Sequence, residues 1–393
     1  MKIAAIIGGL VTQSSGVANV VCALANEFER LEQTSRIYTA TCRGRPLVTN
    51  MLDHPETCVA EPGIAMGGLA WSPKLRRRIQ MDFDTVDIVH NHSLWMLPNS
   101  YAAEEAQRRR IPLVYSIHGF LEPWALQNSR WKKRIAGRVF QDRQLHGAAC
   151  LHANSIAELG SIRRYGLRNP VAIIPNGASI PAPPSSTGIA GEGDATVVTS
   201  GKKVILFLSR LHEKKGLDVL LEAWQHMKDV QSEWHLVIAG PDDGYGRIVR
   251  RQIDDLGLCK DVTLSDPVTG SDKMSLLQSA DIFILPSYSE GFSVVLLEAM
   301  ACSVPILYTK GCNFPEAMLH GAGVELEYPS VVAVETGLRQ MVIMTDQERA
   351  DMGEKAHALV QRNYRWDHIA STYLSLYRWL SEEGDQPECV ENT

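Results

Sequence analysis

Short apolar runs alternate with longer amphipathic stretches along the first half of the chain. Most runs end in Gly, His, Asn or Ser, and helix-length stretches such as residues 16–31 separate them. The runs cover residues 1–9, 86–93, 111–119, 148–155 and 171–177. Buried runs of this length between helical stretches are typical of βα units, so the pattern predicts a parallel sheet.

The same alternation starts again in the second half. Predicted strands cover residues 204–211, 233–241, 261–266, 280–287 and 304–309. Predicted helices lie at about 216–229, 245–257, 271–279, 293–302 and 314–319. Residues 346–380 also have a helical pattern, whereas residues 381–393 have the composition of a frayed tail.

Residues 178–203 separate the two series. They are rich in Ala, Gly, Ser, Thr and Pro and contain no aromatic residue, which is typical of a linker. A chain of 393 residues is too long for one ordinary domain. We therefore predict an N-terminal domain (1–180), a linker (181–203) and a C-terminal domain (204–365). The expected fold is α/β, with two Rossmann-like, doubly wound parallel-sheet domains that face each other across a cleft.

Composition and cysteine placement exclude several classes of protein. Charged residues make up 21% and apolar residues 45%, a globular balance that argues against a disordered or fibrous chain. The eight cysteines form no C-x-x-C pair, which argues against a disulfide framework or a structural zinc and favours a reducing cytoplasm. No apolar run approaches the ~18 residues needed to span a bilayer. The apolar start of the chain is broken by Gly8 and Gly9, so it fits a first strand better than a signal peptide.

The net charge of −6 conceals an asymmetry, because residues 1–180 carry +7 and the remainder −13. The positive residues of the first half cluster at Lys74 and Arg76 to Arg78, at Arg108 to Arg110, and at Arg130, Lys132, Lys133, Arg134, Arg138 and Arg143, with Trp124 and Trp131 nearby. Such clusters can bind an anionic membrane surface or an acidic substrate. For any single cluster, a solvated helix face is the somewhat better explanation.

Two cations stand where the first strand of the second series turns into a helix. Arg210 and Lys215 are five residues apart in SRLHEKKGLD, and Gly216 opens the helix. Parallel sheets bind ligands at the carboxyl ends of their strands, where a helix N-terminus adds about half a positive charge. The pattern predicts a pyrophosphate site, although an isolated R-x4-K-G is more often a solvated loop.

Two acids flank an apolar run in SYSEGFSVVLLEAMACSVPIL. We expect Glu290 on the loop after a strand and Glu298 inside the following helix. An ionised carboxylate accepts hydrogen bonds from vicinal hydroxyls, so Glu290 is expected to bind a transferred sugar and Glu298 a ribose. The structural alternatives are a helix N-terminal acid for Glu290 and a partly buried acid paired with an Arg for Glu298. The backbone N–H groups expected to bind oxygens at the helix start are those of Phe292, Ser293, Val294 and Val295.

Histidines end two strands of the first series. His118 follows VYSI and is expected at the ligand edge of the sheet, where it could bond a sugar or a departing phosphate. A histidine that caps loop carbonyls is about as plausible. His90 and His92 share one face of another strand, but no Cys or carboxylate set accompanies them, so we expect no metal.

These motifs together resemble the retaining family 4 glycosyltransferases of GT-B architecture, or glycosyl transferases group 1. The resemblance runs from GGLVTQSSGVANVVCALA through VYSIHGF, IIPNG, LSRLHEKKGLDVLLEAW and LVIAGPDDGY to SADIFILPSYSEGFSVVLLEAMACSVPIL. It also implies that a terminal helix (366–384) crosses back to the N-terminal domain. Ser293 and Ser303 depart from the family, which more often has Gly at both positions.

The resemblance implies a role for each site residue. Residues matching Arg210 and Lys215 bind the donor pyrophosphate, Glu290 touches the donor sugar and Glu298 the ribose. A glycine matching Gly16 lies near the diphosphate, a histidine matching His118 lies beside the reacting sugar, and the residue matching Val268 meets the nucleobase through its backbone.

The expected reaction transfers a sugar from a UDP- or GDP-sugar to a hydroxyl of a glycan or lipid-linked acceptor. The donor would bind mainly to the second domain, and Arg210, Lys215 and the helix N-terminus would stabilise the leaving diphosphate. No acid is evidently placed as a nucleophile, so retention would come from same-face attack, with the leaving phosphate oxygen accepting the acceptor's proton. We expect no cofactor, no metal and no nucleic acid.

Other functions stay open at this stage. A nucleotide-sugar epimerase of similar architecture would need no acceptor, and a non-catalytic binding protein peripheral to a membrane would use only the basic clusters. A Rossmann dehydrogenase is disfavoured because Gly8, Gly9 and Gly16 do not form G-x-G-x-x-G. The basic charge of the N-terminal half favours a glycan or lipid-linked acceptor, as in cell-surface polysaccharide synthesis. We expect the protein in the cytoplasm, at the inner face of the membrane.

Overall fold

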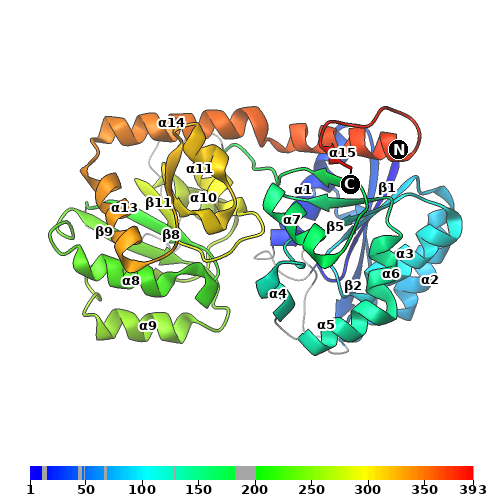
Figure 1. Ribbon diagram of the computed structural model, residues 1–393, viewed down its shortest axis with the longest axis horizontal. Helices are drawn as coiled ribbons and strands as arrows, with labels where there is room; N and C mark the ends of the chain where they lie inside the picture. Colours follow the sequence, from blue (N-terminus) through cyan, green and yellow to red (C-terminus); the bar gives the residue numbers. More distant parts are fainter. Residues whose placement is uncertain are drawn as a thin grey trace. The chain divides into compact units, whose positions relative to one another are not determined.

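The computed structural model (Figure 1) describes residues 1–10, 16–42, 47, 49–65, 69–127, 130–181 and 201–392, without the side chains of residues 130 and 132. The chain forms two compact units. The N-terminal unit comprises Met1–Asn176 with Trp366–Thr393, and the C-terminal unit comprises Gly177–Arg365. Most of the expected linker, residues 182–200, lies outside the described residues, as do residues 11–15 of the expected glycine loop.

The described part of the N-terminal unit is built on one sheet, and its strands are parallel except for the last. In spatial order the strands are β3 (Cys58–Gly63), β2 (Thr34–Cys42), β1 (Lys2–Ile7), β4 (Ile88–His92), β5 (Leu113–Ser116), β6 (Cys150–Ala153), β7 (Val171–Ile173) and β14 (Val390–Glu391). All five predicted strands are present. The central strands β4 and β5 are buried at every position, and β1 is buried after Lys2, because helices cover both faces. In β4 the buried positions include the polar residues His90, Asn91 and His92.

Helices of the N-terminal unit are α1 (Gly16–Arg30), α2 (Pro73–Asp82), α3 (Leu97–Arg109), α4 (Pro123–Gln127), α5 (Arg130–Ala136), the π-helix η3 (Gly137–Gln141), α6 (Asp142–His146), α7 (Ile156–Tyr165) and α15 (Trp366–Leu380), with short 3₁₀ turns η1 (Pro55–Thr57) and η2 (Phe83–Thr85). Local signals set their ends. Ser72 and Ser155 cap α2 and α7 through their hydroxyls, and Gly166 ends α7 in the left-handed region. The helix α15 packs on α1, with the rings of Phe28 and Tyr377 5.8 Å apart.

The described part of the C-terminal unit has a wholly parallel sheet. Its strands, in spatial order, are β10 (Val262–Ser265), β9 (Trp234–Ala239), β8 (Lys203–Leu208), β11 (Ile282–Leu285), β12 (Ile306–Thr309) and β13 (Gly323–Leu326). One face carries α8 (Leu217–His226), α9 (Gly246–Asp255) and α13 (Val331–Ile343), and the other α10 (Gly270–Gln278), α11 (Val294–Ala301) and α14 (Asp346–Asn363) (Figure 1). The remaining short elements are α12 (Pro315–Leu319) and the 3₁₀ turns η4 (Glu213–Lys215) and η5 (Lys310–Cys312).

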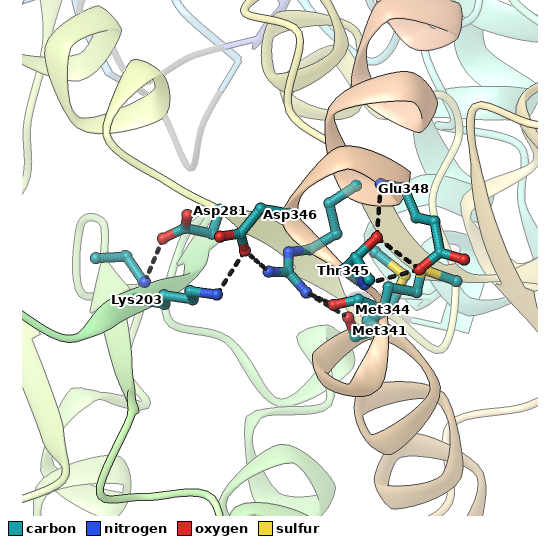
Figure 2. Close-up of polar contacts among 9 residues, drawn as sticks. Lys203, Asp281, Met341, Met344, Thr345, Asp346 and Glu348 are labelled. Carbon is teal, nitrogen blue, oxygen red and sulfur yellow. Dashed lines mark hydrogen bonds and ion pairs between the residues drawn. The ribbon is translucent and has the colours of Figure 1, made fainter.

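Polar contacts join the start of α14 to the beginning of β8 (Figure 2). Lys203 Nζ donates to Asp346 Oδ1 at 2.5 Å, and the guanidinium of Arg349 bonds the same carboxylate. Arg349 also donates to the Met341 carbonyl oxygen at 3.2 Å. Thr345 and Glu348 form a capping box, so the helix start is satisfied by its own side chains.

The α/β class with two parallel sheets is confirmed, whereas some local expectations were incomplete or wrong. The predicted frayed tail is wrong in part, because Val390 pairs antiparallel with Ala172 of β7. The strands β2, β3 and β13 and the helix α13 were not predicted. The eight cysteines, all within the described residues, are unpaired. Among the described residues, every helix is too short or too polar to cross a membrane.

Candidate functional site

The loop after β8 carries the two predicted cations. Its Leu211 N–H donates to the Pro241 carbonyl oxygen at 2.8 Å, which ties the loop to the one after β9. Gly216 has φ +69 and links η4 to α8. A Cβ at Gly216 would lie 2.1 Å from the carbonyl oxygen of Pro286. Glycine therefore permits the close approach between this loop and the loop after β11.

The backbone around Glu290 is fixed from several sides. The Tyr288 N–H donates to the Lys214 carbonyl oxygen at 2.8 Å, and the Glu290 N–H donates to the Gly311 carbonyl oxygen at 2.7 Å. Asn313 Nδ2 donates to the carbonyl oxygen of Glu290 at 2.5 Å. Both backbone polar groups of Glu290 are thus bonded, and its side chain is held at the carboxyl edge of the sheet.

Lys215 and Glu290 form a buried ion pair. The Lys215 Nζ and Glu290 Oε1 atoms are 2.5 Å apart, and the residues are only 6% and 7% exposed. The Ser287 hydroxyl donates to the same oxygen at 2.6 Å. Burial alone would raise the pKa of Glu290, but the charges of Lys215 and Lys214 and the two hydrogen bonds lower it below its usual range. The Glu290 carboxylate is therefore ionised at neutral pH.

The helix α11 begins beside this pair. Its first residue is Val294 and its N-cap is Ser293, whose side chain makes no capping bond. Phe292 and Val295 pack against the core of the unit. The four residues thus combine apolar anchoring with backbone donors at the helix start that have no partner inside the helix, an arrangement suited to an anion.

Glu298 is the fifth residue of α11, and its partner is a lysine rather than the arginine considered above. The Lys273 Nζ of α10 lies 2.5 Å from Glu298 Oε1, with side chains 22% and 18% exposed. A partly exposed pair can exchange its partners for a ligand hydroxyl at modest cost. Glu298 thus lies deeper along the helix than Glu290, as expected.

Arg210 does not join the Lys215–Glu290 pair among the described residues. Its guanidinium forms an ion pair with Asp243 in the loop after β9, where both side chains are nearly half exposed. Val268 follows β10, and its half-buried side chain packs against the core. Because β8, β9, β10 and β11 are parallel neighbours, the loops after them share one edge of the sheet.

The structure therefore brings the predicted donor residues of the C-terminal unit to one sheet edge and its following helix. Within the part of the chain that the structure describes, Lys215 and Glu290 are the two predicted side chains that form an ion pair with each other. Their roles toward a ligand stay predictions. Ser303, one of the two departures from the family pattern, adopts φ +59, the left-handed conformation that a glycine would favour.

His118 and Gly16 belong to the N-terminal unit. His118 follows β5 with φ +50, and its Nε2 lies 3.1 Å from His92 Nδ1. Burial and the neighbouring His152 lower the pKa of His118 to about 3, so its imidazole is neutral at pH 7. Gly16 is the first residue of α1, and a Cβ there would meet no atom within 4 Å. Packing among the described residues does not require a glycine at that position.

A buried carboxylate clamps the turn that contains His118. Glu158 accepts hydrogen bonds from the Asn154 N–H at 2.6 Å and from the Gly119 N–H. Burial raises the pKa of Glu158 to about 7, although the two backbone donors oppose the shift. The sequence contained a signal for this residue, because Ser155 and Glu158 form the S-x-x-E spacing of a capping box.

A chain of buried hydrogen bonds joins the strands β4, β5 and β6 to α15. His90 bonds Tyr377 and Ser116, each at 2.6 Å, and Ser116 bonds His152 at 2.7 Å. The Tyr373 hydroxyl lies 2.9 Å from His152 Nε2. Histidines at this edge are thus committed to side-chain partners. Among the described residues, no three His, Cys, Asp or Glu side chains are arranged to hold a metal ion.

The N-terminal unit also contains a cavity of about 430 Å³. Its lining combines cations, aromatic rings and an amide: Trp95, Pro123, Leu126, Gln127, Lys133, Arg134 and Tyr165. Lys133 Nζ donates to the Ala125 carbonyl oxygen at 2.5 Å, which fixes the position of that cation. Cations and rings together can bind a polar, anionic small molecule.

Sequence reasoning missed the partners of the predicted residues. Lys273, Asp243 and Ser287 were not singled out, and neither was Glu158. The missed ion-pair partners Lys273 and Asp243 lie 25 and 33 residues from Glu298 and Arg210, so no local pattern indicates them.

Two family models match this chain in succession. Residues 14–180 match the model described as Glycosyltransferase Family 4, and residues 194–359 match the model described as Glycosyl transferases group 1. The two stretches do not overlap and together cover most of the chain.

Similar curated proteins and solved structures agree with these matches. A D-inositol 3-phosphate glycosyltransferase of Corynebacterium diphtheriae is 26% identical over 314 residues, 74% of this chain and 70% of that protein. A protein of the same name from Pseudarthrobacter chlorophenolicus is 25% identical over 323 residues, covering 80% and 76%. Anabaena HepE in complex with UDP-glucose has a TM-score of 0.74 at 19% identity, over 96% of this chain and 99% of that one. Sucrose-phosphate synthase from Thermosynechococcus elongatus has a TM-score of 0.75 at 18% identity, covering 96% and 98%.

Proposed function

We propose, from the premise that this chain belongs to the group 1, family 4 glycosyltransferases, that it moves a sugar from a nucleotide-diphosphate sugar to a hydroxyl with retention of configuration. The observation that carries the donor side is the buried Lys215–Glu290 pair beside the N-terminus of α11. A carboxylate held ionised at a strand end, next to a cation and free helix donors, suits a ligand with hydroxyls and an anionic group.

The leaving diphosphate would be stabilised by the loop after β8. Arg210 would exchange Asp243 for a phosphate oxygen, which is inexpensive because that ion pair is nearly half exposed. Lys215 and the backbone donors of α11 would add fixed positive charge where the negative charge grows as the glycosidic bond lengthens. Glu290 and Glu298 would then hold the sugar and ribose hydroxyls, and Val268 the base.

Two residues of the N-terminal unit are also proposed to contact the donor. Packing in the described fold does not explain a glycine at position 16. Its lack of a side chain would instead leave room for the diphosphate. His118 is neutral at pH 7, so it can donate or accept a hydrogen bond with the transferred sugar without adding charge. Same-face attack, with the leaving phosphate oxygen taking the acceptor's proton, accounts for retention without a protein nucleophile or a metal.

The donor we favour is a UDP-sugar, because HepE has been solved with UDP and with UDP-glucose. The acceptor we propose is a glycan or lipid-linked molecule of cell-surface polysaccharide synthesis. The cavity lined by Lys133 and Arg134 would bind an anionic group on it. The eight unpaired cysteines support a cytoplasmic location, and the basic charge of the N-terminal half supports contact with the inner face of the membrane.

A thermal-shift panel of UDP-, GDP- and ADP-sugars tests the donor site. We expect one nucleotide class to raise the melting temperature and the Lys215→Met variant to lose that shift. Incubation of the wild-type enzyme with donor alone then separates transferase from epimerase, because an epimerase would convert the sugar without an acceptor. A shift that survives Lys215→Met unchanged would remove this residue from the donor site.

A further inference from the structure

His118 lies in a turn with an unusual backbone conformation. The Phe120 N–H donates to the Ile117 carbonyl oxygen at 3.1 Å, which closes a turn of four residues. The two central residues, His118 and Gly119, have φ +50 and +76, the positive values that a type I′ turn requires. Glycine adopts this conformation readily, whereas a histidine keeps it only where its surroundings fix it. Contacts from outside the turn therefore determine the conformation of His118.

Glu158, in the first turn of α7, holds this turn from outside. One of its carboxylate oxygens accepts the Gly119 N–H and so fixes the peptide group between His118 and Gly119. The other accepts the backbone N–H of Asn154 at 2.6 Å and its side-chain amide at 3.2 Å. Gly119 follows β5 and Asn154 follows β6, which are parallel neighbours. The carboxylate therefore joins the carboxyl ends of two adjacent strands.

A carboxylate is an unfavourable group for this buried position. Glu158 is 1% exposed, and all of its hydrogen-bond donors within the described residues are neutral amides. The buried acids Glu105 and Glu290, by contrast, each pair with a cation. Burying an ionised group without a cation is more unfavourable than burying a neutral one. A glutamine of the same shape has one acceptor oxygen, so it cannot take the donors of both strands through two oxygens. The second oxygen of Glu158 is therefore what the turn requires.

The imidazole of His118 is held by a second contact. Its Nε2 atom lies 3.1 Å from Nδ1 of the buried His92, and the two rings stack with their centroids 5.4 Å apart. Burial lowers the pKa values of both rings, so both are neutral at pH 7 and one nitrogen of the pair donates to the other. The backbone and the ring of His118 are thus fixed from two elements, α7 and β4.

We infer that Glu158 is a positioning residue for the reaction: its carboxylate holds the turn of residues 117–120 and thereby fixes the imidazole of His118. The inference rests on the proposed function, in which His118 bonds the transferred sugar. Placement matters to the rate, because a shift of about 1 Å can cost about 100-fold. Protonation of Glu158 converts one acceptor oxygen into a donor and so weakens its hold on the turn. Turnover should therefore rise with the ionised fraction of Glu158.

The titration of Glu158 can be separated from that of its neighbours. Burial raises the pKa of Glu158 to about 7, and the charge of Glu122, in the loop after β5, adds to the shift. Tyr373 of α15 also acts on Glu158, and burial raises the pKa of this tyrosine well above its usual value. Burial lowers the pKa of His118 to about 3 and that of His152 to about 4. Between pH 6 and 8 these histidines stay neutral and the tyrosine stays protonated.

Glu158→Gln tests the inference, because it keeps the shape of the side chain and removes one acceptor oxygen. At pH 8 we expect it to lower kcat at least about tenfold while KM changes less than about twofold. The wild-type kcat should fall between pH 8 and pH 6, whereas that of Glu158→Gln should stay low and flat. The matched control is Glu105→Gln, which alters a buried carboxylate of α3 that pairs with Arg108 and Arg109. It should keep the wild-type rate and pH profile.

Combination with His118→Ala separates positioning from a general structural role. If Glu158 acts through His118, adding Glu158→Gln to His118→Ala should lower kcat further by less than about threefold. Losses that multiply would overturn the inference, and so would an equal loss of kcat in the Glu105→Gln control.

A measurement without substrates keeps the inference distinct from the proposed function. In protein labelled with nitrogen-15 histidine, the NMR signals of His118 are identified by their absence from His118→Ala. They should move in Glu158→Gln and stay in place in Glu105→Gln. Unmoved His118 signals would overturn the inference even in an active transferase. Moved signals in a wild-type chain that transfers no sugar would support the hold of Glu158 on His118 and refute the proposed function instead.

Discussion

Removing the cation of the Lys215–Glu290 pair should destabilise the C-terminal unit strongly. Lys215→Met keeps the length of the side chain but leaves the buried Glu290 carboxylate without its nearest charge. Breaking a buried pair in this way costs about 3–5 kcal/mol. The Ser287 hydroxyl and the Lys214 charge remain near Glu290, so we expect the lower end, about 3 kcal/mol.

The assay is calorimetric unfolding at pH 7 and at pH 5. For a unit of this size, about 3 kcal/mol lowers the melting temperature by roughly 6–12 °C. Without Lys215, burial dominates and the pKa of Glu290 rises, so protonation at pH 5 should reduce the loss. In the wild type the pKa of Glu290 is lowered on folding, so its ionised form stabilises the folded state. Its stabilisation is present above the ordinary value of 4.5 and is lost as the pH falls below it.

Two further variants make the reasoning refutable. Lys215→Met/Glu290→Gln should recover most of the loss, because no uncompensated charge is then buried. Lys273→Met, at the partly exposed pair with Glu298, is the matched control and should cost only about 1 kcal/mol. If Lys215→Met melts within 2 °C of the wild type at pH 7, or loses as much at pH 5 as at pH 7, the pair is not the buried ionic contact described here.

Three other predictions concern catalysis and pH. Arg210→Ala should lower kcat at least tenfold while the melting temperature changes little, because its pair with Asp243 is nearly half exposed; near-normal turnover would exclude a role in the transition state. Transfer should continue in EDTA, and a loss of activity that a divalent ion restores would contradict the metal-independent proposal. Glu158 has a pKa raised to about 7 in the folded chain against an ordinary 4.5, so the wild type should lose on the order of 3 kcal/mol between pH 4.5 and 7. Glu158→Gln should lack this slope in melting curves, and an unchanged slope would mean that another group titrates.

Strand prediction succeeded where burial is complete and failed at the sheet margins. The strands β4 and β5 are buried along their whole length, and each begins with two or three apolar residues before its polar end. By contrast, β2 (TSRIYTATC) mixes exposed and buried positions, and β3 (CVAEPG) has no fully buried residue and contains a proline, so neither pattern was strong. The last strand, β14, has two residues and depends wholly on its partner β7, which no local pattern can indicate.

The candidate site was predictable in its residues but not in its contacts. Arg210, Lys215, Glu290 and Glu298 could be chosen because strand ends and helix starts are legible in the sequence. Their ion pairs depend on how loops from different strands approach one another. That approach is set by backbone features such as Gly216 against Pro286, which lie 70 residues apart. The sequence therefore indicated the edge of the sheet, while only the fold showed that Lys215 rather than Arg210 bonds Glu290.

The path of the polypeptide has a consequence for synthesis on the ribosome. The N-terminal unit is discontinuous, because α15 and β14 are made last yet bury Tyr373 and Tyr377 against strands made first. The intervening C-terminal unit can finish folding while the earlier unit still waits for its final helix. Nascent chains stalled before residue 366 should consequently expose an apolar surface to chaperones, and release of the completed chain would conceal it.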